Sequence, residues 1–176
     1  PFFPSILIFP MDVFKCVKTR RSVRKFTSKT VDRDSIEKIL EYGRWAPSGL
    51  NHQPWRVIVV SDSDLKSKLA GCTHYDRIIN DAPHLIVVLL DKTNTYSYVK
   101  NVQSIGAFFQ NILLGIHDMG LGGVWLGEIY NQKDKVHELL NIDSEKWEFM
   151  GAISFGQPTA KGSSDRKEPQ EFVQCK

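Results

Sequence analysis

Apolar residues recur along the chain with two different periods, and these periods predict an alternation of helices and strands. A spacing of three and four residues predicts helices over 12–19, 32–45, 64–71, 99–119 and 133–140. Continuous or β-branched apolar runs predict strands over 55–60, 85–90, 124–127 and 149–155. Pro47 stops the second of these helices, and a glycine-rich turn ends the long one.

The order of these elements predicts the fold class. Few of the strand-helix-strand units are short enough to force an all-parallel sheet, so we expect an α+β fold with a mixed central sheet flanked by helices. The long helix is apolar on more than one face, which exceeds what one small sheet can cover. We therefore expect an obligate homodimer.

The first ten residues are apolar but do not resemble an anchor or a leader. They are too short to span a bilayer and lack a basic flank and a small-residue cleavage site. Met11 begins the first helical pattern, so we expect residues 1–10 to be an N-terminal extension upstream of the natural start, or an arm that packs on a partner. Residues 11–176 would then form a single domain, since no linker or repeat divides them.

Composition excludes several classes of function. The 23 basic and 20 acidic residues leave a formal charge of +3, too little for a general attraction to nucleic acid. The three cysteines are odd in number and far apart, which predicts neither a disulfide framework nor a metal site and fits a reducing cytoplasm. The five histidines show no ligand spacing, so we expect no metal.

The densest chemical signal is the basic segment 20–26, Arg-Arg-Ser-Val-Arg-Lys-Phe. Guanidinium groups pair bidentately with phosphate oxygens, and alternate residues of an extended segment point the same way. Arg20, Ser22 and Arg24 would then line one side of an anionic ligand. The alternative is a solvated basic turn, which charge alone favours.

A second signal is the segment 46–55, Ala-Pro-Ser-Gly-Leu-Asn-His-Gln-Pro-Trp. Its two prolines fix backbone torsions, while Ser48, Asn51 and Gln53 offer neutral donors and acceptors suited to the edge of a heterocycle. An ordinary loop whose polar groups bond their own backbone would look the same.

The glycine-rich segment 120–127 is not a dinucleotide fingerprint. Its glycines follow a helix and precede a strand, whereas the fingerprint requires the opposite order. The sequence has no Walker-type Gly-Lys-Ser/Thr and no Ser/His/Asp arrangement with a nucleophile elbow. The tryptophans at 45, 55 and 125 stand in apolar runs, which indicates core positions rather than a nucleic-acid surface.

The three segments, in this order, resemble the nitroreductase family of FMN-dependent oxidoreductases, specifically its small single-domain members. The similarity runs from Met11 into the tail and rests on Arg-Arg-Ser-x-Arg, Ala-Pro-Ser-x-x-Asn-x-Gln-Pro-Trp and Gly-Leu-Gly-x-x-Trp-x-Gly. It implies a cytoplasmic α+β homodimer, with intertwined chains and one FMN at each of two sites built from both subunits.

The resemblance also implies cofactor-binding residues. Arg20 and Ser22 would hold the phosphate and ribityl end, with Arg21 contributing through its backbone or to the phosphate, and Arg24 would lie near the flavin pyrimidine. From the partner subunit would come four residues that cover the ring and ribityl chain: Pro47, Ser48, Gly49 and Asn51. Leu126 and Gly127 would lie near flavin N5. Arg166 and Lys167, in the tail, would make a second contact to the phosphate.

The implied reaction is a ping-pong transfer from NADH or NADPH, through tightly but non-covalently bound FMN, to a nitroaromatic or quinone-like acceptor. We expect no catalytic side chain, no nucleic acid partner and no membrane. The segment from Tyr75 to Asn80 departs from larger members, because it lacks a recognisable flavin-ring Asn and Lys. Two alternatives are a non-catalytic flavin-binding or regulatory module and a flavin-destructase or dehalogenase branch of the same superfamily.

Overall fold

The computed structural model describes residues 11–93 and 95–175, so the expectations for residues 1–10 lie outside the described residues. Its helices are α1 (Val13–Thr19), α2 (Arg33–Arg44), α3 (Ser63–Ala70), α4 (Asp76–Asp81), α5 (Tyr98–Asp118) and α6 (Lys133–Leu140). Three of them begin where an aspartate side chain accepts a backbone N–H of the first turn: Lys15 to Asp12, Ser35 to Asp32 and Leu65 to Asp62.

Four strands form one sheet in the order β1-β2-β4-β3: β1 (Trp55–Val60), β2 (His84–Asp91), β3 (Gly122–Leu126) and β4 (Trp147–Gly156). The α+β class is confirmed. The three strand pairings are all antiparallel, and the parallel pairing found in the described residues is an isolated bridge between Ser22 and Gly123. Parallel pairing in the expected mixed sheet is therefore limited to that bridge. The chain enters β2 at the same end of the sheet at which it left β1, because α3 and α4 lie between the two strands without crossing to the other end.

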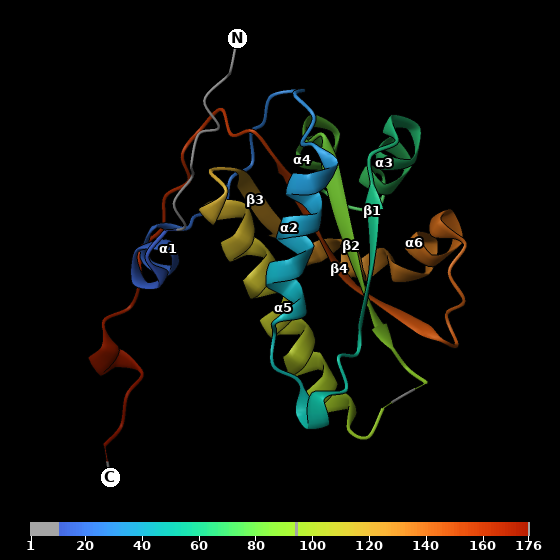
Figure 1. Ribbon diagram of the computed structural model, residues 1–176. Coiled ribbons are helices and arrows are strands. Elements are labelled where there is room, and N and C mark those ends of the chain that lie inside the picture. The colour runs from blue at the N-terminus through green and yellow to red at the C-terminus, as the bar shows by residue number, and fades with distance from the viewer. Residues whose placement is uncertain (1–10, 94, 176) are drawn as a thin grey trace.

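The strand β2 lies at the centre of the core and is buried along its whole length. Its side chains alternate between two apolar clusters, as the twofold period of a strand requires. Ile86, Val88 and Leu90 pack with residues of α2 and α5, whereas Leu85, Val87 and Leu89 pack on the side of α3, α4 and α6. Figure 1 shows α5 and α2 on one side of the sheet and α6 on the other.

The predicted helices and strands are confirmed to within a few residues at their ends, and one helix was missed. The short α4 has no side-chain cap at its N-terminus and a single turn of apolar pattern, with Ile78 and Ile79 buried. Among the described residues no helix is long and apolar enough to cross a bilayer.

His84 ties the loop before α2 to the sheet. The backbone N–H of Val31 donates to its Nε2 over 3.0 Å, so the proton is assigned to Nδ1, which lies 2.8 Å from the Ser61 hydroxyl. Burial, and then the charge of Lys66, lowers the pKa of His84. The folded protein therefore keeps this imidazole neutral.

We expect the free energy of unfolding to fall as the pH drops below about 6.5. The unfolded chain takes up a proton at the ordinary histidine pKa of 6.5 while folded His84 resists it, so the stabilisation is present above that pH and is lost below it. One such group contributes at most about 1.4 kcal/mol per pH unit. Urea unfolding at pH 7.5 and 5.5 measures the loss, and His84→Gln should reduce it. An unchanged pH profile in that variant would contradict the assignment.

Candidate functional site

The basic segment lies extended at the edge of the sheet. Ser22 forms its parallel bridge with Gly123, and the N–H of Val23 donates to the Gly123 carbonyl over 3.0 Å. On its other side Phe26 pairs antiparallel with Pro158. This two-sided support confirms an extended segment, so it is not a solvated turn. Ser22 and Arg24 line the same hollow of about 250 Å³, whose other wall is the tail over 160–163.

Positive charge gathers at the start of this segment. Arg20 is partly buried, and its pKa is lowered first by that burial and then by the charges of Arg166 and Arg21. The Arg21 guanidinium donates to the carbonyls of Lys18 and Arg20, over 2.7 and 2.8 Å, at the end of α1. In the described part of the chain, the ion pairs found all lie elsewhere. Arg20, Arg21 and Arg166, which we call the arginine cluster, therefore carry unpaired positive charge that favours an anion.

Arg166 comes to this cluster from the polar tail. Its Nη1 donates to the Ser164 hydroxyl and to the Asp165 carbonyl, each over 2.7 Å, which fixes one side of the guanidinium. Lys167 follows it on the exposed tail. The charge of Arg166 thus acts on Arg20, although 145 residues of the sequence lie between them.

Beyond the Ser22 bridge a second hollow of about 250 Å³ opens along β3. Its lining includes Arg24, Leu126 and Gly127, all three expected at a flavin. Because Arg24 lines both hollows, they adjoin. Trp125 also lines the second hollow. Its ring stacks on that of Phe109, with centroids 4.2 Å apart and an angle of 9°.

Five lining residues of this second hollow were not predicted as site residues from the sequence: Tyr75, Ile78, Val124, Trp125 and Glu128. The expectation that Trp125 is a core residue is wrong, because β3 is the outer strand of the sheet and the ring remains 44% exposed. The same expectation is wrong for Trp45, which is 72% exposed at the end of α2, and is confirmed for Trp55. Alternation along β3 predicts that Trp125 and Val124 lie on opposite faces of the sheet, but it does not predict that Trp125 is exposed.

Glu128 is another residue that lines the second hollow. Its carboxylate accepts from the Thr73 hydroxyl and from the backbone N–H of His74, which lowers its pKa and holds it ionised. These bonds join the end of β3 to the segment that carries Tyr75. The segment from Tyr75 to Asn80, for which the sequence suggested no role, therefore lines part of the hollow.

The loop that carries Pro47, Ser48, Gly49 and Asn51 lies at the other end of the molecule. It packs against Tyr96, just before α5 begins, whereas the basic segment lies near the end of α5 (Figure 1). A helix of 21 residues is about 30 Å long, so one chain does not bring the two groups together.

The loop itself has an unusual backbone. Three residues other than glycine have left-handed torsions, with φ of 52° at Leu50, 56° at Asn51 and 48° at Gln53. Such torsions cost free energy and concentrate at functional sites. The Ser48 hydroxyl accepts from the Gln53 N–H over 2.9 Å, which helps to hold this shape. The polar groups of the loop thus support its own backbone, as the alternative interpretation expected.

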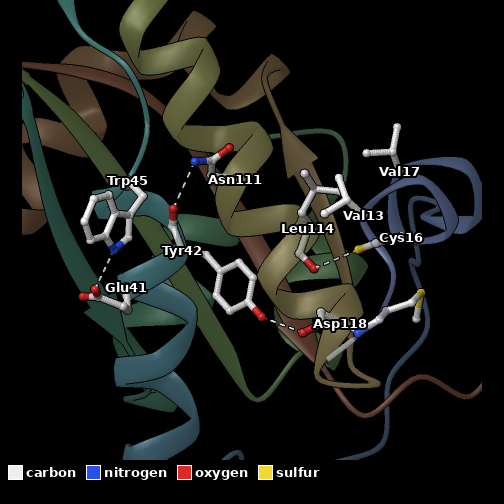
Figure 2. A pocket seen from close by; sticks show the side chains of 10 residues that line it. Val13, Cys16, Val17, Glu41, Tyr42, Trp45, Asn111, Leu114 and Asp118 are labelled. Carbon is white, nitrogen blue, oxygen red and sulfur yellow. Dashed lines mark hydrogen bonds between the residues drawn. The ribbon is translucent and has the colours of Figure 1, made fainter. Parts of the chain in front are cut away.

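A larger hollow of about 440 Å³ lies between α1, α2 and α5, and none of the predicted site residues line it. Figure 2 shows Val13 and Val17 on one side of this groove, Tyr42 and Trp45 on the other, and Leu114 between them. Val13, Val17 and Trp45 each expose more than half of their surface. Such an apolar surface is typical of an interface.

No group of three or more potential metal ligands is found among residues 11–93 and 95–175. Buried histidines of the described chain accept backbone hydrogen bonds instead, as His137 does from the N–H of Phe149 over 3.1 Å. The candidate site is therefore the pair of hollows that adjoin at Arg24.

Comparison with known proteins gives consistent similarities. The model of the nitroreductase family matches residues 17–74 and 70–157. A protein of Methanothermobacter thermautotrophicus with the provisional name NADH dehydrogenase/NAD(P)H nitroreductase is 36% identical over 134 residues, covering 76% of this chain and 70% of that protein. The FMN reductase [NAD(P)H] of Bacillus subtilis is 24% identical over 180 residues, covering 92% and 72%.

Solved structures have the same fold. A crystal structure from Desulfovibrio desulfuricans, provisionally named a nitroreductase and in complex with FMN, has a TM-score of 0.91 and 39% identity, covering 96% of this chain and 98% of that one. Nitroreductase A of Vibrio parahaemolyticus has a TM-score of 0.84 and 25% identity, covering 94% and 75%.

Proposed function

The chain belongs to the nitroreductase family, and from this premise we propose that it is a flavoprotein oxidoreductase. It would bind FMN and pass reducing equivalents from NADH or NADPH to an organic acceptor, such as a nitroaromatic or a quinone. The observation that carries the proposal is the pair of adjoining hollows, one lined by Ser22 and Arg24 of the basic segment and the other by Arg24, Leu126 and Gly127.

The arginine cluster fits the phosphate of FMN. Arg20 and Arg166 repel each other when no anion lies between them. After burial, this repulsion is the second cause of the lowered pKa of Arg20. A phosphate dianion would remove that repulsion and accept charge-assisted hydrogen bonds from both guanidinium groups. The hydroxyl of Ser22 would add a neutral donor at the same end of the site.

The second hollow fits the flavin ring. Trp125, which stacks on Phe109, and Gly127 both line it, and the backbone N–H of Gly127 would donate to a ring nitrogen. Arg24 lies at the junction of the two hollows, where its charge would stabilise the negative charge that the ring gains on reduction. The bound FMN supplies the two-electron redox chemistry.

A second copy of the chain would complete each site. The loop over 47–51 and the basic segment lie at opposite ends of α5 in one chain. In a twofold dimer every contact is made twice, so a loop that met the partner's basic segment would complete both sites. We propose that the groove between α1, α2 and α5 belongs to that dimer interface, because its exposed apolar side chains require cover. Analytical ultracentrifugation should give the mass of a dimer, and a monomer would contradict this part.

The contribution of the chain is then binding, orientation and electrostatics, and no side chain need act as acid or base. The nicotinamide and the acceptor would use the same exposed side of the ring in turn, which is a ping-pong cycle. Glu128 would hold the Tyr75 segment as one wall of that space.

The experiment that tests the function is an absorbance spectrum of the purified protein, followed by anaerobic addition of NADH and, separately, NADPH. We expect bands of bound flavin that bleach within seconds and return when a quinone or a nitroaromatic is added. A protein that stays colourless after reconstitution with FMN would contradict the proposal. Bound flavin that neither nucleotide reduces would favour a flavin-binding module without turnover, and turnover of a halogenated phenol would favour the dehalogenase branch.

A further inference from the structure

The tail after β4 does not leave the molecule but pairs with the basic segment. The N–H of Thr27 donates to the Gln157 carbonyl over 2.9 Å, and the N–H of Thr159 donates to the Lys25 carbonyl over 3.0 Å. These bonds flank the antiparallel bridge of Phe26 with Pro158. Two chain segments far apart in sequence thus form a short ladder.

Farther along the tail, Gly162 lies close against Ser22. A side-chain carbon built on Gly162 would lie 2.4 Å from the Ser22 carbonyl oxygen and 2.7 Å from the Arg21 Cβ. The first of these atoms is backbone, so the contact is not relieved by turning a flexible side chain. Ser22 is itself fixed from the other side by its bridge to Gly123. Any larger residue at position 162 must therefore push the tail outward.

The position of the tail determines where Arg166 lies. Gly162 and its neighbours form one wall of the hollow that Ser22 and Arg24 line. Arg166 follows four residues later, and its charge acts on Arg20. If the tail moved outward at residue 162, the two guanidinium groups would separate.

We propose that Gly162 is a positioning residue: its missing side chain lets the tail lie against Ser22 and so sets where Arg166, four residues later, makes the second contact to the FMN phosphate. This inference rests on the proposed function, and it concerns only the phosphate end of that site.

The test compares FMN with riboflavin, which lacks the phosphate. In Gly162→Ala the dissociation constant of FMN, measured by quenching of flavin fluorescence, should rise roughly tenfold, as expected for one lost charge-assisted hydrogen bond. The dissociation constant of riboflavin should change less than about twofold, because its ring contacts are untouched. The matched control is Gly106→Ala, where an added carbon meets nothing within 4 Å, and it should change neither constant.

A double-mutant cycle separates positioning from a general structural effect. Arg166→Gln should itself weaken FMN binding and spare riboflavin, and Gly162→Ala added to it should cost little more, because both changes remove the same contact. Additive effects, equal loss of both flavins, or unchanged FMN binding in either single variant would overturn the inference. Should Gly162→Ala not fold, Arg166→Gln still tests the inference, because unchanged FMN binding in that variant would leave Gly162 no phosphate contact to position. If the unmodified protein binds neither flavin, the proposed function fails instead.

Discussion

Replacing Arg20 with alanine is expected to raise the dissociation constant of FMN by roughly 100-fold, which corresponds to the loss of a bidentate charge-assisted contact. Arg20 is partly buried, so its bonds to a phosphate would be less screened by water than those of an exposed arginine. Riboflavin should bind nearly as before. Isothermal titration or fluorescence quenching with both flavins measures the difference.

The matched control for Arg20→Ala is Arg33→Ala, which removes the same charge from an exposed pair with Glu37 on α2 and should leave both constants unchanged. A second expectation concerns the protein without flavin. Because the charge of Arg166 disfavours that of Arg20, the flavin-free Arg20→Ala protein should unfold at no lower temperature than the parent. Equal loss of FMN and riboflavin would show instead that the substitution damages the fold.

Replacing Phe109 with alanine is expected to lower the free energy of unfolding by about 3–5 kcal/mol, the usual cost of a large cavity in a packed core. Phe109 is completely buried in the cluster between α5 and the sheet. That loss would consume much of the total stability of a domain of this size. Urea unfolding at pH 7.5 measures it.

The same substitution should weaken FMN and riboflavin together, because Phe109 supports the Trp125 ring at 4.2 Å and Trp125 forms a wall of the ring hollow. This pattern contrasts with that of Arg20→Ala, which affects the phosphate end alone. Phe109→Leu, which keeps most of the volume, should lose less than half as much stability. An unchanged affinity for both flavins in folded Phe109→Ala would remove Trp125 from the site.

Much of the fold could be predicted from the sequence because most elements carry their own signal. The strand β2 is a continuous apolar run, which is typical of a strand buried on both faces, and α5 repeats apolar residues over 21 positions. The relative direction of the strands was harder to predict. It depends on the end of the sheet to which the connecting helices return the chain, and no local sequence pattern indicates that.

The candidate site could be predicted only in part, for the same reason. Arg20, Ser22 and Arg24 stand close together in sequence and share a simple geometry, so their grouping could be predicted. The approach of the tail to Ser22 is a contact between distant segments, and the exposure of Trp125 depends on β3 being the outer strand. The short α4 lacked a capping residue that would have indicated its start.

The pairing of the tail with the basic segment has a consequence for how the protein is made. A ribosome that adds about 5–20 residues per second needs some 7–30 s to pass from residue 20 to residue 166. During that time the first arginine of the cluster is already synthesised and the second is not. The phosphate end of the proposed site cannot close on the nascent chain until this late segment has emerged. Cofactor loading would therefore belong to the last stage of biogenesis, and a translation product cut short before Arg166 should emerge folded but poor in flavin.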